Sequence, residues 1–201
     1  MSSNKKRHRE ILKQHKARKK RLKERLREAL PSEKRFMFQD YLVNCEDVIS
    51  QMVPAEGVLF RLAHNPNTDI DIFPTSLWNY DSLTPKITEL PDTIPAGSTI
   101  DDQQEQVREY LPSFNVSEEG AVAPFLDRLN QMKTPLQLLS FKNKKGSHVF
   151  AYDVQPEDGR MWIEPSGHVL FQPYEGFNLA DHVVSDFVPI PIENYIHHET
   201  E

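Results

Sequence analysis

The sequence predicts an α+β fold: a basic N-terminal helix, then a mixed, mostly antiparallel, split or curved sheet with packed helices. Three observations carry this prediction. The charge changes sign near residue 31, short β-like runs fill the C-terminal half, and stretches with helical spacing lie between them. Its 201 residues allow one domain and an appendage. We therefore expect a basic arm over 1–31, a globular domain over 32–190 with a long loop at 64–100, and a flexible tail over 191–201.

The charge is divided unevenly along the chain. Residues 1–30 hold thirteen Lys or Arg and three Glu, a net of +10. The remaining 171 residues hold eleven Lys or Arg and 27 Asp or Glu, a net of −16, and the two values sum to −6. Such asymmetry is typical of an interaction arm. The arm would bind nucleic acid or another anionic surface, dock on an acidic protein surface such as the body of the same chain, or stay a solvated helix or frayed arm.

Several classes of protein are excluded by what the sequence lacks. No apolar run approaches the roughly 18 residues of a membrane span, and the charged start leads into no apolar signal segment. Cys45 is the only cysteine, so no intramolecular disulfide forms and no cysteine-rich metal site is expected. We expect a cytoplasmic protein with no transmembrane segment, and export by a route that reads no N-terminal signal stays open.

The N-terminal half predicts two helices and one strand. Strong helix formers fill residues 5–30, and Pro31 ends that helix. Apolar residues at helical spacing predict a second helix over 33–52. The run Gly57–Ala63 reads as a β-strand, and the Pro- and Asn-rich stretch after it reads as the long loop.

The C-terminal half predicts most of the sheet. Asp101 is the expected cap of a short helix, and Ser117 opens a longer one. We expect a helix over 101–110, a strand over 111–116, a helix over 117–132, a hairpin of 136–141 with 148–154, strands over 161–164 and 168–172, and a last strand over 177–188.

The order of polar residues along these elements carries a resemblance to a known family. Arg61 lies on an early strand, and much later Ser113 and Asn115 end a strand that leads into a helix. A hairpin and a strand that begins at His168 follow. Over residues 57–185 this order resembles the ADP-ribosyltransferase toxins of the arginine–serine–glutamate type. Two departures are visible: the polar triplet reads Ser-Phe-Asn instead of Ser-Thr-Ser, and His168 stands where the family has its final Glu.

The resemblance implies an NAD-dependent transferase that modifies a macromolecular target, as a toxin or effector does. Arg61 would hold the phosphates of NAD, because a guanidinium binds phosphate oxygens as a fork. Ser113 and Asn115 would shape the nicotinamide pocket. Glu164 or His168 would occupy the catalytic acid position, where a carboxylate stabilises the oxocarbenium-like ribose.

Two other functions stay open at this point. The chain order Cys45, His148, Glu164 resembles that of papain-like hydrolases and the related toxin deamidases, in which a His activates a Cys thiolate. Cys45 falls on an apolar stripe, where a lone cysteine is usually a small core residue. The third function is a non-enzymatic binding or inhibitor protein, whose acidic body covers a basic site on its partner while the basic arm binds nucleic acid.

Overall fold

The structure of the protein is a computed structural model, and it describes residues 34–42, 44–64, 72–74, 77–79, 84–85 and 99–196. The chain divides into two compact units, Met1–Arg35 and Phe36–Glu201. All the helices and strands described below belong to the second unit. The predicted arm helix, most of the predicted loop at 64–100 and the last residues of the predicted tail lie outside the described residues.

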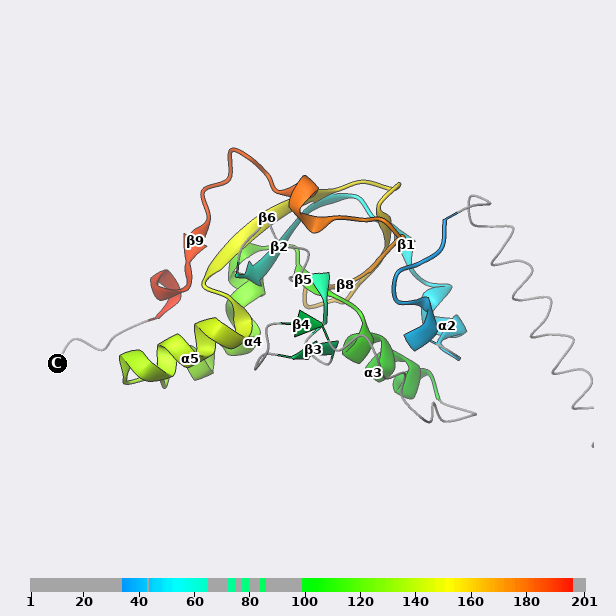
Figure 1. Cartoon of the computed structure of the whole chain (residues 1–201). Coiled ribbons are helices and arrows are strands. Elements are labelled where there is room, and N and C mark those ends of the chain that lie inside the picture. Colours follow the sequence, from blue (N-terminus) through cyan, green and yellow to red (C-terminus); the bar gives the residue numbers. More distant parts are fainter. Residues whose placement is uncertain are drawn as a thin grey trace, which may run out of the picture. The chain divides into compact units, whose positions relative to one another are not determined.

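The second unit is built on an open, seven-stranded sheet in which every pairing is antiparallel (Figure 1). The strand order is β1-β7-β8-β5-β2-β6-β9, and β3 and β4 form a separate pair. The strands are β1 (Val53–Pro54), β2 (Gly57–Ala63), β3 (Trp78–Asn79), β4 (Thr84–Pro85), β5 (Ser113–Asn115), β6 (His148–Val154), β7 (Gly159–Ile163), β8 (His168–Pro173) and β9 (Ile190–Pro191).

Four α-helices and 3-10 turns pack with this sheet, so the described fold is mixed α+β, as predicted. The helical elements are η1 (Gln39–Tyr41), α2 (Glu46–Ile49), α3 (Ile100–Tyr110), α4 (Glu118–Asn130), α5 (Pro135–Lys145), η4 (Leu179–His182) and η5 (Ile192–Tyr195). No helix within the described ranges is both long enough and apolar enough to cross a bilayer.

The register of the strands assigns each side chain to one of two faces, because residues paired across antiparallel strands share a face. On the first face an apolar cluster spans the sheet under irregular segments. Its buried members are Ala55, Leu59, Ala63, Ile72, Phe114, Phe150, Tyr152, Val154, Met161, Val169, Phe171 and Leu179. The side chains on this face therefore form a continuous hydrophobic core.

The second face is covered by helices in two separate groups. One cluster packs η1, α2 and α3 against Leu170 of β8, and it includes Cys45 and Val107. The other packs α4 and α5 against Leu62 and Val149. In Figure 1 these two groups of helices lie on opposite sides of the view. Polar residues of β5 and β8 lie on the stretch of the face between the two clusters.

Several predicted elements are confirmed. β2 has the predicted bounds, and β6, β7 and β8 lie where strands were predicted. α4 begins after Ser117, whose hydroxyl accepts a hydrogen bond from the Gly120 N–H. The predicted cap of α3 is wrong: Thr99, and not Asp101, caps the helix, and Asp102 returns the bond in a capping box.

The predicted strand over 136–141 is wrong, because these residues belong to α5. Thr134 and Gln137 form a capping box, and Pro135 stands at the first position of the helix, where its missing N–H costs nothing. α5 ends at Gly146, whose φ of 107° suits glycine. These local signals outweigh the apolar run that was read as a strand.

The second predicted helix, over 33–52, is also wrong as a continuous element. It is broken into the short η1 and α2, with Asn44 between them at a φ of 68°. Phe36 forms an isolated β-bridge with Tyr174 instead. The apolar residues of the predicted stripe are nevertheless buried, as Cys45 and Val48 show.

The predicted strand over 177–188 is wrong as well. This segment contains the 3-10 turn η4 and a single bridge, between Tyr152 and Val183. The edge position beside β6 is taken by β9, which pairs His148 with Pro191. Ile192 follows at once and is fully buried.

Candidate functional site

Four polar side chains meet on the second face, between the two groups of helices. They are Ser113 on β5, His168 on β8, Glu164 in the β7–β8 turn and Arg108 near the end of α3. We call these four residues the polar cluster. Three of them were predicted as site residues from the sequence, and Arg108 was not.

The backbone positions this cluster through strand pairing and one tight turn. β5 pairs antiparallel with β8, so Asn115 lies opposite His168 and Ser113 lies opposite Leu170. The turn from β7 to β8 is closed by hydrogen bonds from the Glu164 N–H to the His168 carbonyl, at 2.8 Å, and from the Gly167 N–H to the Glu164 carbonyl, at 2.9 Å. Gly167 has a φ of 84°, which favours glycine. The turn therefore places Glu164 against the first residue of β8.

The side chains of β5, β8 and the β7–β8 turn form a chain of contacts. Ser113 Oγ lies 2.5 Å from His168 Nε2, and His168 Nδ1 lies 3.2 Å from Glu164 Oε2. A carboxylate on one ring nitrogen favours the proton there, which leaves the other nitrogen able to accept a proton from a hydroxyl. The geometry therefore gives His168 the arrangement of a general base held by Glu164.

Arg108 completes the cluster from the helix side. Its Nε and Nη2 donate to Glu164 Oε1 at 2.8 and 2.7 Å, and its guanidinium lies 5.7 Å from the centre of the Trp162 ring. The Arg108 side chain is 47 % exposed and that of Glu164 is 16 % exposed. No hydrogen bond or ion pair between described residues uses Nη1. No sequence spacing indicated Arg108, because its contact with Glu164 depends on how α3 packs.

Asn115 shares this face with His168, but its side chain is engaged locally. It is 6 % exposed, and its Oδ1 accepts a hydrogen bond from the Ser117 N–H at 3.1 Å. A Cβ at Gly120 would overlap the Asn115 amide, so the side chain is held under the first turn of α4. Asn115 therefore joins β5 to α4.

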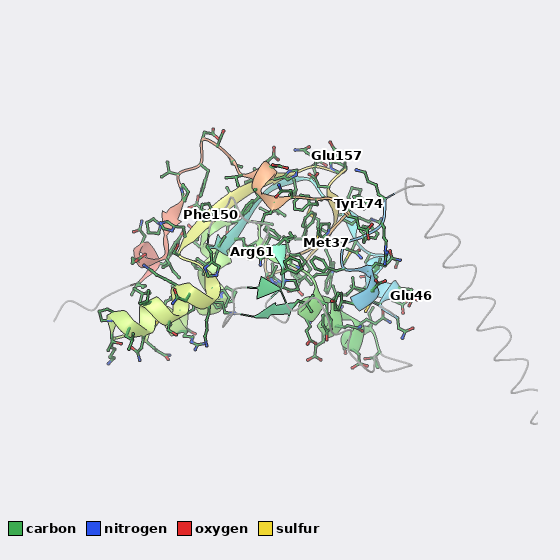
Figure 2. All side chains as sticks on the ribbon, in the orientation of Figure 1. Met37, Glu46, Arg61, Phe150, Glu157 and Tyr174 are labelled. Carbon is green, nitrogen blue, oxygen red and sulfur yellow. The ribbon has the colours of Figure 1, made fainter. Side chains whose placement is uncertain are left out.

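Arg61 lies on the other face of the sheet, away from the polar cluster. It pairs with Phe150 in the β2–β6 register, and Figure 2 shows the two residues on these neighbouring strands. Its Nη2 donates to the Phe73 carbonyl at 3.1 Å, and its guanidinium lies 5.2 Å from the centre of the Phe114 ring. The neighbouring Phe60 pairs with Asn115, which puts the cluster on the opposite side of β2. The structure therefore separates Arg61 from the other predicted site residues.

Cys45 and His148 do not form a catalytic pair. Cys45 is fully buried, and its thiol donates to Gln106 Oε1 at 3.2 Å. Burial, together with the nearby charge of Glu46, raises the pKa of the Cys45 thiol to about 11. A reactive cysteine needs the opposite shift. His148 is bonded instead to its neighbour Ser147, with 2.8 Å between the ring Nδ1 and the hydroxyl. These contacts give the cysteine hydrolase no support, and that function stays a prediction.

Comparisons with known proteins found no match to this chain: no protein-family model, no curated protein and no solved structure matches it. Across the described part of the chain, no group of three or more His, Cys, Asp or Glu side chains is arranged to hold a metal ion.

Proposed function

We propose that the globular unit is an ADP-ribosyltransferase-like domain that cleaves NAD at the polar cluster and modifies a macromolecular target in the cytoplasm. One observation carries the proposal. β5 and β8, which carry Ser113 and His168, are neighbours in the sheet, and the turn before β8 brings Glu164 against His168. The resemblance assigns these three residues to one site. The basic segment 1–31 would anchor the protein on a nucleic acid or another acidic surface.

The proposed chemistry divides the roles among the residues of the cluster. Cleavage of the bond between nicotinamide and ribose leaves a sugar with oxocarbenium character, which the carboxylate of Glu164 stabilises. His168 takes the proton of the attacking hydroxyl as the general base. Ser113 holds the ring through the contact at Nε2 until the acceptor replaces it. Nicotinamide leaves, and the acceptor oxygen forms the new bond to the ribose carbon.

In this proposal Arg108 replaces Arg61 as the residue that binds phosphate. Arg108 contacts Glu164 through two of its nitrogens, and its side chain is 47 % exposed. Arg61 lies on the opposite face and is bonded to the Phe73 carbonyl. The two arginines therefore make a matched pair for an experiment. The order of elements along the chain points to Arg61 as the phosphate-binding residue, and the geometry points to Arg108.

The test is a titration of the full chain with NAD, followed by a measurement of nicotinamide release. We expect saturable binding that Arg108→Gln weakens about tenfold or more, because a charged hydrogen bond to phosphate is lost. Arg61→Lys should leave the affinity within about twofold, and circular dichroism of both variants checks that the fold is retained. Absence of saturable NAD binding, or equal loss in both variants, would overturn the proposal.

A second function is favoured by one specific contact, the 2.5 Å between Ser113 Oγ and His168 Nε2. With Glu164 on the other ring nitrogen, the three side chains have the order of contacts of a Ser-His-Glu triad. In that case Ser113 Oγ attacks an acyl carbon, its proton passes to His168, and the leaving group takes that proton. The protein would then be a serine hydrolase or acyltransferase.

Labelling with a fluorophosphonate separates this function from the first. A nucleophilic Ser113 would react, and Ser113→Ala or His168→Ala would abolish the labelling. Ser147 is a matched control, because its hydroxyl also contacts a histidine, with 2.8 Å between the hydroxyl and Nδ1 of His148. Labelling that persists in Ser113→Ala would exclude the serine hydrolase, and NAD cleavage without labelling would leave the transferase alone.

A further inference from the structure

A groove between α4 and α5 gathers positive charge on a domain that is acidic overall. Arg128 of α4 and Lys144 and Lys145 of α5 line it, together with the polar Gln131. Met132 and Phe141 form its apolar part, and no carboxylate lines it. Residues 31–201 carry a net charge of −16, so a carboxylate-free group of three cations is a local exception.

The charges of this groove are not neutralised within the described residues. No described ion pair joins Arg128, Lys144 or Lys145 to a carboxylate, and the Lys145 ammonium lies instead 5.1 Å from the centre of the Phe125 ring. Lys142, on the same helix, is different, because its ammonium is paired with the carboxylate of Glu193. α5 therefore carries one neutralised lysine and two that face the groove.

The electrostatics of Lys145 agree with this arrangement. Partial burial lowers the pKa of Lys145, and the positive charges of Arg128, Arg61 and Lys144 lower it further. Like charges held together in this way repel one another until an anion arrives. A bound anion would offset both the repulsion between the cations and the loss of hydration around Lys145. The free groove is therefore arranged for a negatively charged ligand.

The size and lining of the groove narrow the class of ligand. It encloses about 330 Å³, near the lower end of the roughly 300 to 1,000 Å³ that small-molecule sites occupy. We propose that it binds a nucleoside di- or triphosphate, with the phosphates held by Arg128, Lys144 and Lys145. Met132, which is half-buried, supplies an apolar surface for the base. Three cations in one compact groove suit clustered phosphates better than they suit an extended anionic chain.

This site is independent of the proposed transferase. The groove is built from α4 and α5, and none of its lining residues belongs to the polar cluster. Arg108, which would bind NAD, lies on α3 instead. A variant of one site therefore leaves the residues of the other unchanged, and each proposal can fail without the other.

Isothermal titration of the full chain tests the site with ATP, inorganic tripolyphosphate and adenosine as separate probes. We expect saturable binding of ATP, weaker binding of tripolyphosphate and none of adenosine. The double variant Arg128→Gln, Lys144→Gln should weaken ATP binding at least about tenfold. Lys142→Gln is the matched control, because it removes a lysine from the same helix without touching the groove, and it should change the affinity by less than about twofold.

Other outcomes overturn the proposal. ATP binding that the double variant leaves intact would place the anion on the basic segment 1–31. Equal loss with Lys142→Gln would show a general charge effect. A single-stranded oligonucleotide that binds more tightly than ATP, and only while the groove is intact, would assign the groove to a nucleic acid instead. Arg108→Gln separates the sites, since it should leave ATP binding unchanged.

Discussion

The polar cluster and the α4–α5 groove of the same unit differ in whether their positive charges contact a carboxylate. In the polar cluster Arg108 and His168 both contact the carboxylate of Glu164, so charge is balanced inside the protein. In the groove Arg128, Lys144 and Lys145 stand together with no lining carboxylate. Charges paired within the protein, as in the polar cluster, hold side chains in a fixed orientation. Cations without a lining carboxylate, as in the groove, favour the binding of an outside anion.

The largest predicted effect is a loss of activity on substitution in the polar cluster. In the proposed transferase, Glu164→Gln would keep the shape of the side chain but remove the charge that stabilises the oxocarbenium-like ribose. We expect nicotinamide release to fall by about 100- to 1,000-fold. Single-turnover rates with saturating NAD measure it. Unchanged rates would show that Glu164 acts only as the partner of Arg108.

A second prediction extends the comparison to a buried group with no charged partner, Cys45. Its pKa is raised to about 11, above the unfolded value, so the thiol stabilises the fold at pH values below about 9. Between pH 9 and about pH 11 the thiol of the unfolded chain ionises while the buried thiol stays protonated, so we expect the free energy of unfolding to fall by about 1 to 2 kcal/mol over this interval. Urea titrations of the wild type and Cys45→Ala at pH 8 and pH 11 measure it. A decline of the same size in both proteins would contradict it.

Neutralising one cation in each region should change stability in opposite directions. Arg108→Gln removes an ion pair that is partly exposed, and we expect a loss of about 0.5 kcal/mol. Lys145→Met removes a partly buried charge from among like charges, and we expect stability to be unchanged or slightly higher. Urea unfolding of both variants at pH 7 checks the signs. A clear loss in Lys145→Met would mean that its ammonium is neutralised in the folded protein.

The smallest effect concerns pH and Lys145. Its folded pKa lies below the unfolded value, so the unfolded chain binds more protons between the two values and stability rises with pH in that interval. Lys145→Met should remove this contribution. Comparing the slopes of unfolding free energy against pH between 8 and 10 in the two proteins detects it, and identical slopes would contradict it.

The sequence predicted the fold where a single local signal decided the element. β2 and β8 follow from their apolar runs, and α4 follows from its Ser117 cap. The segment 136–141 carried conflicting signals, and the Thr134 capping box decided it in favour of a helix. The apolar run alone does not decide between strand and helix, and the helix leaves two of its leucines exposed, Leu136 at 75 % and Leu139 at 53 %.

The candidate site was predictable only in part, for a different reason. Ser113, Glu164 and His168 could be chosen from their order along the chain, and the structure brings them together. The face that each residue occupies depends on strand register, and a shift of one position exchanges the faces. Arg61 was grouped with them by order, yet the register puts it on the opposite face. Arg108 belongs to the cluster through helix packing, which no sequence spacing specified.

The position of β2 in the sheet has a consequence for how the protein is made. Gly57 pairs with Val154, about a hundred residues later in the chain, and Phe60 pairs with Asn115. Such distant pairings raise the contact order and slow folding. During synthesis β2 leaves the ribosome well before β5 and β6, so both of its edges are unpaired until those strands are made. A chain that stops before β6 should keep an open edge on β2 and aggregate, which ties correct folding to completion of the C-terminal half.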